Sequence, residues 1–129
     1  MARVIKAQGS AACGTPGVCE GIETGLAVMV ARPDLKVWAC LSAGGLERFV
    51  LPPTVRRILM LADNDKSGTG LRAAERAKAR FRRDGQTAVI TMPPRPGEDF
   101  NDLLIRDGPE AVGQLVDIAM LPPRNTYWN

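Results

Sequence analysis

Apolar positions along the chain form two kinds of pattern, short continuous runs and sets at helical spacing. Residues 57–62 and 87–92 are continuous runs rich in aliphatic and β-branched side chains, and they predict strands. The first run is apolar except for Arg57 at its start, which is typical of a strand covered on both faces in a parallel sheet. Residues 36–41 predict a third strand, and the short apolar stretch at residues 18–19 predicts a fourth.

Helically spaced apolar residues lie between these runs. One helix is predicted to end before Pro33, and a second to run from about Leu71 to Arg83, with Gly85 as its stop. The spaced residues of the first helix are Ile22, Leu26, Met29 and Val30. The inner face predicted for the second helix consists of Leu71, Ala74, Ala77 and Phe81. Short helices follow the polar loop at residues 97–102, and one begins at Pro109.

This alternation of strands and helices predicts an α/β fold. Its sheet is expected to be central and mainly parallel, with about four strands, right-handed crossovers and flanking helices. The length of 129 residues suits one domain over residues 1–120, with residues 121–129 as a linker or tail.

The residue types present restrict the chemistry. The chain has no histidine, and its three cysteines have no paired metal-ligand spacing, which argues against zinc and excludes Ser-His and Cys-His catalysis. Carboxylates, lysine, hydroxyls or a hard metal ion remain. A net charge of +3 weakly favours an anionic partner. No apolar run is long enough to cross a membrane and no secretory signal is recognisable, so we expect a cytoplasmic protein without membrane partners.

Carboxylates follow two of the predicted strands. Glu20 comes after residues 18–19, and Asp63 and Asp65 come after residues 57–62. Ligands of parallel α/β sheets bind at the carboxyl ends of strands, so these acids are expected to converge. Two carboxylates about 4 Å apart repel each other by roughly 4 kcal/mol at an effective dielectric of 20. A cation relieves this repulsion, and Mg²⁺, with Mn²⁺ as a substitute, suits carboxylates completed by waters and phosphate oxygens.

Glycines accompany these acids. Gly21 permits a tight turn from strand to helix, while Gly68 and Gly70 allow a phosphate to approach the start of the next helix. Lys66 is a candidate cationic contact to the same phosphate.

Together these motifs resemble the Toprim domain of primases, topoisomerases and small nucleases, above all the type in phage and plasmid primase-helicase proteins. The resemblance covers residues 17–105. It is carried by four segments, EGIETGLA at residues 20–27, LSAGGL at residues 41–46, LADNDKSG at residues 61–68 and DFNDLL at residues 99–104.

The resemblance implies a Rossmann-like Toprim fold in which Asp63 and Asp65 hold Mg²⁺. Glu20 is then the acid/base or a further metal ligand. Cellular primases carry a second acid four positions after this glutamate, where this chain has Thr24, so whether Glu23 reaches the metal is open. Additional candidates for the site are Glu23, Lys66, Asp99, Asn101 and Asp102.

The function implied by the resemblance is primer synthesis within a larger primase or helicase protein. Nucleotides and single-stranded DNA would be the partners of this Mg²⁺-dependent nucleotidyl transfer. The isolated chain is expected to bind metal and to synthesise little primer. The alternatives are a Toprim nuclease and a non-catalytic nucleic-acid or partner-binding module; a topoisomerase is disfavoured because the only tyrosine, Tyr127, lies in the tail.

Other interpretations explain less of the sequence. An EF-hand loop starting at Asp63 would place Ala74 where glutamate is required, after a strand rather than a helix. A haloacid-dehalogenase phosphatase leaves Glu20 unexplained. A basic stripe on the second helix is a candidate contact to the DNA backbone, although a solvated face is the commoner meaning. The stripe consists of Arg72, Arg76, Arg80 and Arg83.

Overall fold

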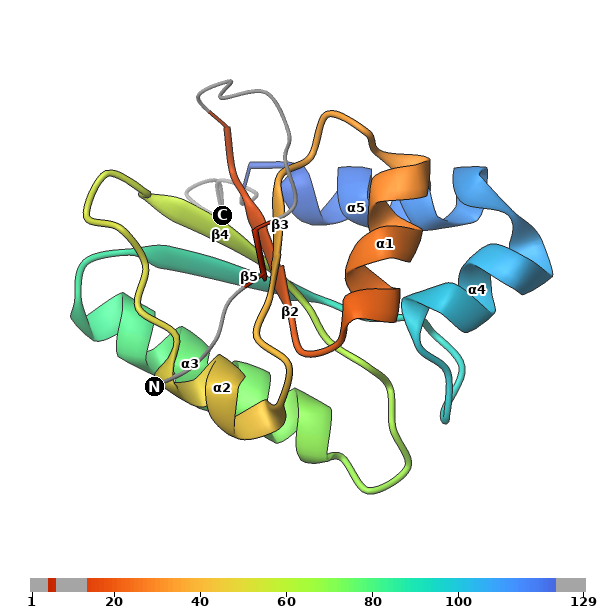
Figure 1. Ribbon diagram of the computed structural model, residues 1–129. Helices are drawn as coiled ribbons and strands as arrows, with labels where there is room; N and C mark the ends of the chain where they lie inside the picture. The colour runs from red at the N-terminus through yellow and green to blue at the C-terminus, as the bar shows by residue number, and fades with distance from the viewer. Residues whose placement is uncertain (1–4, 7–13, 123–129) are drawn as a thin grey trace, which may run out of the picture.

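A five-stranded sheet lies between two layers of helices in the computed structural model, which describes residues 5–6 and 14–122 (Figure 1). In spatial order the strands are β1 (Ile5–Lys6), β3 (Val37–Ala39), β2 (Gly17–Cys19), β4 (Arg57–Leu61) and β5 (Thr87–Thr91). The last four are mutually parallel, and β1 pairs antiparallel with β3 at the edge. The predicted α/β fold with a mainly parallel sheet of about four strands is confirmed.

Helices cover both faces of the sheet. They are α1 (Ile22–Ala31), α2 (Ala43–Arg48), α3 (Thr69–Arg83), α4 (Phe100–Asp107) and α5 (Pro109–Met120). Figure 1 shows α2 and α3 on one face and α1, α4 and α5 on the other. Within the described residues, no helix combines the length and apolar character needed to span a membrane.

The central strand β4 supplies both halves of the core. Its side chains alternate between the two faces, as a strand requires. Ile58 and Met60 join the cluster under α2 and α3, which includes Phe81. Leu59 and Leu61 join the opposite cluster, which includes Phe100. All are almost completely buried, so the prediction of a strand covered on both faces is confirmed.

Helix α3 packs on the sheet through a row of small side chains. Ala74, Ala77 and Phe81 are buried as predicted, but Leu71 is only half-buried and Ala73 takes its place. The helix begins at Thr69, two residues before the predicted start, and its periodicity directs Ala73 rather than Leu71 at the sheet. The prediction that Leu71 lies on the inner face of this helix is therefore wrong, and Ala73 lies there.

The strand predicted over residues 36–41 ends earlier, at Ala39. Leu41 has a φ of 68° and is the one non-glycine residue in the described ranges with a left-handed backbone, which costs about 1–2 kcal/mol. Its amide still donates to the Glu20 carbonyl oxygen at 2.6 Å. The chain then turns into α2, where the Ser42 hydroxyl accepts from the Gly45 amide. The turn to this helix cap shortens the strand.

Helix α1 has the predicted position but an unexpected orientation. Ile22, Leu26 and Val30 are 45%, 56% and 61% exposed, and the helix meets the sheet through smaller residues. At Gly25 an added Cβ would lie 3.2 Å from the Cys19 sulfur. This close packing turns the larger apolar side chains outward.

Two adjacent glycines in α2, Gly44 and Gly45, allow a test of how closely this helix approaches the end of β3. An added Cβ at Gly45 would lie 2.3 Å from the Cys40 carbonyl oxygen, whereas at Gly44 it would meet only the flexible end of Arg48. We expect Gly45→Ala to lower the free energy of unfolding by at least about 2 kcal/mol. Gly44→Ala should be neutral or stabilising by up to about 1 kcal/mol. Thermal unfolding followed by circular dichroism measures both; equal midpoints would contradict the close approach.

Candidate functional site

Parallel pairing of β2 with β4 brings the predicted acids together. Cys19 lies opposite Leu61 in the register, so both strands end at the same level of the sheet. Glu20 follows Cys19 directly, and Asp63 comes two residues after Leu61. The carboxyl ends of the two central strands therefore form the acidic edge that the sequence predicts.

Glu20 is a half-buried carboxylate that lies near two other negatively charged side chains. Burial is the main cause that raises its pKa above the ordinary value. The negative charges of Asp63 and Asp65 raise this pKa further, while a hydrogen bond from the Ala43 backbone acts in the opposite direction. These effects together disfavour the ionised form of Glu20 relative to that of an exposed glutamate.

Asp63 is the centre of the acidic cluster. Burial raises its pKa, and the charges of Asp99, Asp65 and Asp102 add to this rise. The Thr24 hydroxyl donates a hydrogen bond of 2.9 Å to the Asp63 Oδ1 atom, which lowers the same pKa. Thr24 is almost fully buried, so its hydroxyl holds Asp63 in one orientation.

Asp65 is oriented by the start of α3. The Gly70 amide lies 3.3 Å from each of its carboxylate oxygens, and the Ser67 hydroxyl donates to Oδ2 at 3.1 Å. A Cβ at Gly70 would come within 3.2 Å of the Asp63 carbonyl oxygen, so the close approach of the helix depends on glycine. Gly68 caps the helix with a left-handed φ of 73°. The predicted phosphate contacts of these glycines and Gly21 stay a prediction.

Asn64 ties the acidic edge to the loop after β5. Its amide donates to the Glu98 carbonyl oxygen at 2.9 Å, and its side-chain nitrogen donates to the Pro93 carbonyl oxygen at 2.9 Å. These bonds place Asp99 beside Asp63. Asp99 is also the N-cap of α4 and forms a reciprocal capping box with Asp102, with hydrogen bonds of 2.8 and 3.0 Å. Both acids thus have a structural role in the loop.

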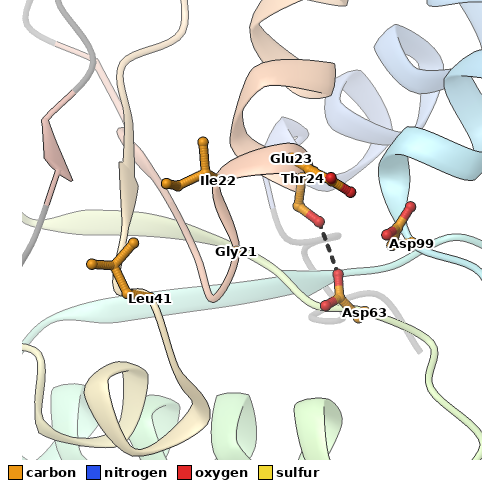
Figure 2. A pocket seen from close by; sticks show the side chains of 7 residues that line it. All are labelled: Gly21, Ile22, Glu23, Thr24, Leu41, Asp63 and Asp99. Carbon is orange, nitrogen blue, oxygen red and sulfur yellow. Dashed lines mark hydrogen bonds between the residues drawn. The ribbon is translucent and has the colours of Figure 1, made fainter.

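An open pocket of about 320 Å³ lies against this edge. It is lined by Gly21, Ile22, Glu23, Thr24, Leu41, Asp63 and Asp99. Figure 2 shows two unlike sides, with Thr24, Asp63 and Asp99 on one and the aliphatic side chains of Ile22 and Leu41 on the other. The pocket therefore offers carboxylate oxygens and apolar surface to the same ligand.

The remaining predicted residues lie around the pocket. Glu23 is exposed at its rim, in the first turn of α1, and whether it reaches a metal stays open. Lys66 is exposed, and its aliphatic stem lies near Gly97. Asn101 is half-buried in the first turn of α4, and no finding tests its role.

Part of the predicted basic stripe on α3 makes contacts within the chain. Arg76 pairs with the Glu47 carboxylate at 2.7 Å. The Arg80 guanidinium donates to the backbone carbonyls of Glu47 and Phe49 and stacks on Phe81. These contacts attach α3 to α2. A DNA contact by this stripe, which also includes Arg72 and Arg83, stays a prediction.

The donor atoms of the site suit a hard cation. In residues 5–6 and 14–122, no group of three or more Cys, Asp or Glu side chains is close enough to form a ready-made metal site. Mg²⁺ does not need one, because it is bound through one or two carboxylates and completes its shell with waters and substrate phosphates. Asp63 and Asp65 supply only oxygen ligands and repel each other, so they fit this pattern of binding.

A parallel α/β sheet with an acidic edge at its carboxyl end defines a class of α/β domains that bind ligands at this edge. This chain belongs to the Toprim domain family, whose model matches residues 15–110. Toprim domains in general bind Mg²⁺ and are typically found in enzymes that act on nucleic acids. No curated protein matches the chain. The resemblance to the Toprim family is confirmed, while its primase-like subtype stays a prediction.

Sequence pattern does not single out three residues that shape the site. Asn64 is the middle of the Asp-Asn-Asp motif, and its partners lie about thirty residues away in the chain. Thr24 stands where the cellular primases have an acid, and Leu41 falls at the end of a predicted strand. Each acts through contacts between distant segments, for which local pattern carries no signal.

Replacing Asp63 by asparagine should stabilise the metal-free protein near neutral pH. The folded chain raises the pKa of Asp63, so its ionisation opposes folding as the pH rises above the ordinary value of 3.8. We expect Asp63→Asn to leave stability unchanged near pH 3 and to raise the free energy of unfolding by up to about 1 kcal/mol near pH 7, because half exposure screens the charge. Thermal melts across this pH range measure the difference. Asp84→Asn, at an exposed position, is the control; a pH-independent difference would contradict the prediction.

Removing the Thr24 hydroxyl should have the opposite effect. Thr24→Val keeps the side-chain volume but leaves the Asp63 carboxylate without this donor, at a cost of about 1 kcal/mol near neutral pH. Thr24→Ser keeps the hydroxyl and should lose less. In the Asp63→Asn background, where no carboxylate is present, the effect of Thr24→Val should shrink, and a double-mutant cycle of chemical denaturation measures this coupling. If the effects of Thr24→Val and Asp63→Asn on the free energy of unfolding were fully additive, the hydrogen bond between Thr24 and Asp63 would not contribute to stability.

Proposed function

We propose that this Toprim domain is the catalytic domain of a DNA primase-like protein and carries out Mg²⁺-dependent nucleotidyl or phosphoryl transfer on nucleic acid. The supporting observation is the convergence of Glu20 and Asp63 at the ends of neighbouring parallel strands, beside an open pocket. Primer synthesis on single-stranded DNA, from nucleotides and within a larger protein, is the specific task proposed.

In this proposal Asp63 and Asp65 hold Mg²⁺, with Mn²⁺ as a substitute. The bound ion supplies binding of the substrate phosphate oxygens and stabilises the charge that develops on them. Asp63 is kept in place for this by the Thr24 hydroxyl, and Asp65 by the Gly70 amide. Both contacts fix the carboxylates before substrate binds, which favours catalysis through preorganisation.

Glu20 has the proposed role of proton carrier or of a further metal ligand. Burial and the charges of Asp63 and Asp65 raise its pKa, so it holds a proton more readily than an exposed glutamate. In primer synthesis it would accept the proton of the attacking hydroxyl; in hydrolysis it would accept the proton of water. The same carboxylates therefore support a nuclease as the second candidate, in which phosphodiester bonds are hydrolysed.

Metal binding is the first test. Calorimetric titration with Mn²⁺ and with Mg²⁺ should show saturable binding to the wild-type chain, and Asp63→Asn/Asp65→Asn should abolish it because both proposed ligands lose their charge. The double variant Asp84→Asn/Glu110→Gln removes the same charge at exposed positions outside the site and should bind like the wild type.

The titration is repeated with nucleotide or single-stranded DNA present, because substrate phosphates complete the metal shell. If the site variant still matches the wild type under these conditions, the catalytic proposal fails and a non-catalytic binding module takes its place. Once metal binding is established, nicking of supercoiled plasmid distinguishes the nuclease from templated synthesis on single-stranded DNA.

A further inference from the structure

The apolar side of the pocket is not explained by metal binding. Ile22 and Leu41 are 45% and 44% exposed, although both are large aliphatic residues. They come from different segments, the start of α1 and the turn before α2, and lie together beside Gly21 in the pocket (Figure 2). Apolar side chains that line a pocket together with a few polar groups are typical of a ligand-contact surface.

Leu41 lies in this wall despite an unfavourable backbone. Its φ of 68° belongs to the region that glycine and asparagine adopt with little cost, yet the position carries a leucine that is 44% exposed. Nearly half of this residue stays exposed, so burial offsets the backbone cost only in part. Backbone strain of this kind beside a pocket indicates that the side chain contributes to ligand binding.

The two sides of the pocket together restrict the chemistry of the ligand. One end must present a group that carboxylates bind through a cation, because Asp63 and Asp99 line that side. The other end must be uncharged and mainly apolar, because Ile22 and Leu41 have no hydrogen-bonding side-chain atoms. A nucleotide has this combination in one small molecule, with a phosphate at one end and the apolar faces of a base at the other.

We propose that Ile22 and Leu41 form a seat for a nucleobase whose phosphate is held at the Asp63 side of the same pocket. This inference rests on the proposed function and names the part of the substrate that the apolar wall contacts. Aliphatic side chains pack against the face of any base without reading its edge. The seat therefore distinguishes a base from no base, and all four bases bind with affinities within about threefold of one another.

The test compares ligands that share a triphosphate and differ in whether they carry a nucleoside. In the presence of Mn²⁺, ATP and inorganic tripolyphosphate are titrated by calorimetry into the wild type, Ile22→Ser and Leu41→Gly. Each variant should weaken ATP binding by about tenfold and leave tripolyphosphate binding unchanged, since it removes one side chain's apolar contact. Ile105→Ser, at an α4 position that is 77% exposed, is the control and should bind both ligands like the wild type.

Leu41→Gly adds a readout that damage to the fold would not produce. Glycine relieves the left-handed backbone, so this variant should melt at the same temperature as the wild type or higher while it binds ATP more weakly. A lower melting temperature together with equal weakening of ATP and tripolyphosphate would overturn the seat, because the change would then be structural.

Oligonucleotides identify the source of the base. Binding of a short single strand of DNA to the wild type and to the two variants is compared with binding of an abasic strand of the same length. If the variants weaken binding of the normal strand but not of the abasic strand, the seat holds a base of the template or primer. If they weaken only the binding of ATP, the seat holds the base of the incoming nucleotide. Either result supports the seat. If the variants bind ATP and the strand like the wild type while metal-dependent tripolyphosphate binding persists, the seat is wrong and the acidic site stands. If the wild type binds no phosphate ligand with metal, the proposed function itself fails.

Discussion

The register between β2 and β4 is the constraint on which the rest of the site depends. Cys19 and Leu61 are paired across two parallel strands, so the chain leaves both strands at the same height. A slip by one residue would turn the side chains of β4 to opposite faces and exchange its two core contacts. Because Ile58 and Leu59 are both fully buried on opposite sides, the core itself opposes such a slip. Hydrophobic packing thus fixes the position of Glu20 relative to Asp63.

Gathering carboxylates at this edge opposes folding, and the surrounding backbone reduces the cost. The Gly70 amide and the Thr24 hydroxyl donate to Asp65 and Asp63, and α1, α3 and α4 all begin close to the site. Helix N-termini carry partial positive charge, which stabilises nearby anions. The pKa values of Glu20 and Asp63 stay raised, mainly through burial and further through the neighbouring negative charges, so this compensation is incomplete. Half-buried carboxylates that also repel one another favour a bound cation.

Strain and exposure concentrate around the same pocket. Leu41 has a left-handed backbone, and Ile22 begins a helix whose larger apolar residues face outward. On the face that α1 covers, the core is formed instead by Ala27 and Val28 of that helix, by the strands, and by buried residues of α4 and α5. Stability therefore comes mainly from the layers on either side of the sheet, whereas the residues around the pocket retain exposed apolar surface and unfavourable charge. Departures of this kind from the ordinary rules of folding are expected where a protein binds its ligand.

The sequence by itself determined the order and type of the elements from β2 onward and the residues of the acidic motif, but not the edge strand β1. Continuous apolar runs such as residues 57–62 and helical spacing in α3 depend on local periodicity, which is visible in one stretch of chain. Only the tertiary structure decided that Asp99 lies beside Asp63, that Thr24 orients Asp63, and that Ile22, Leu26 and Val30 of α1 face outward. The physical reason is that these facts depend on which segments pack together, and Asn64 brings its two loops together through hydrogen bonds that span about thirty residues.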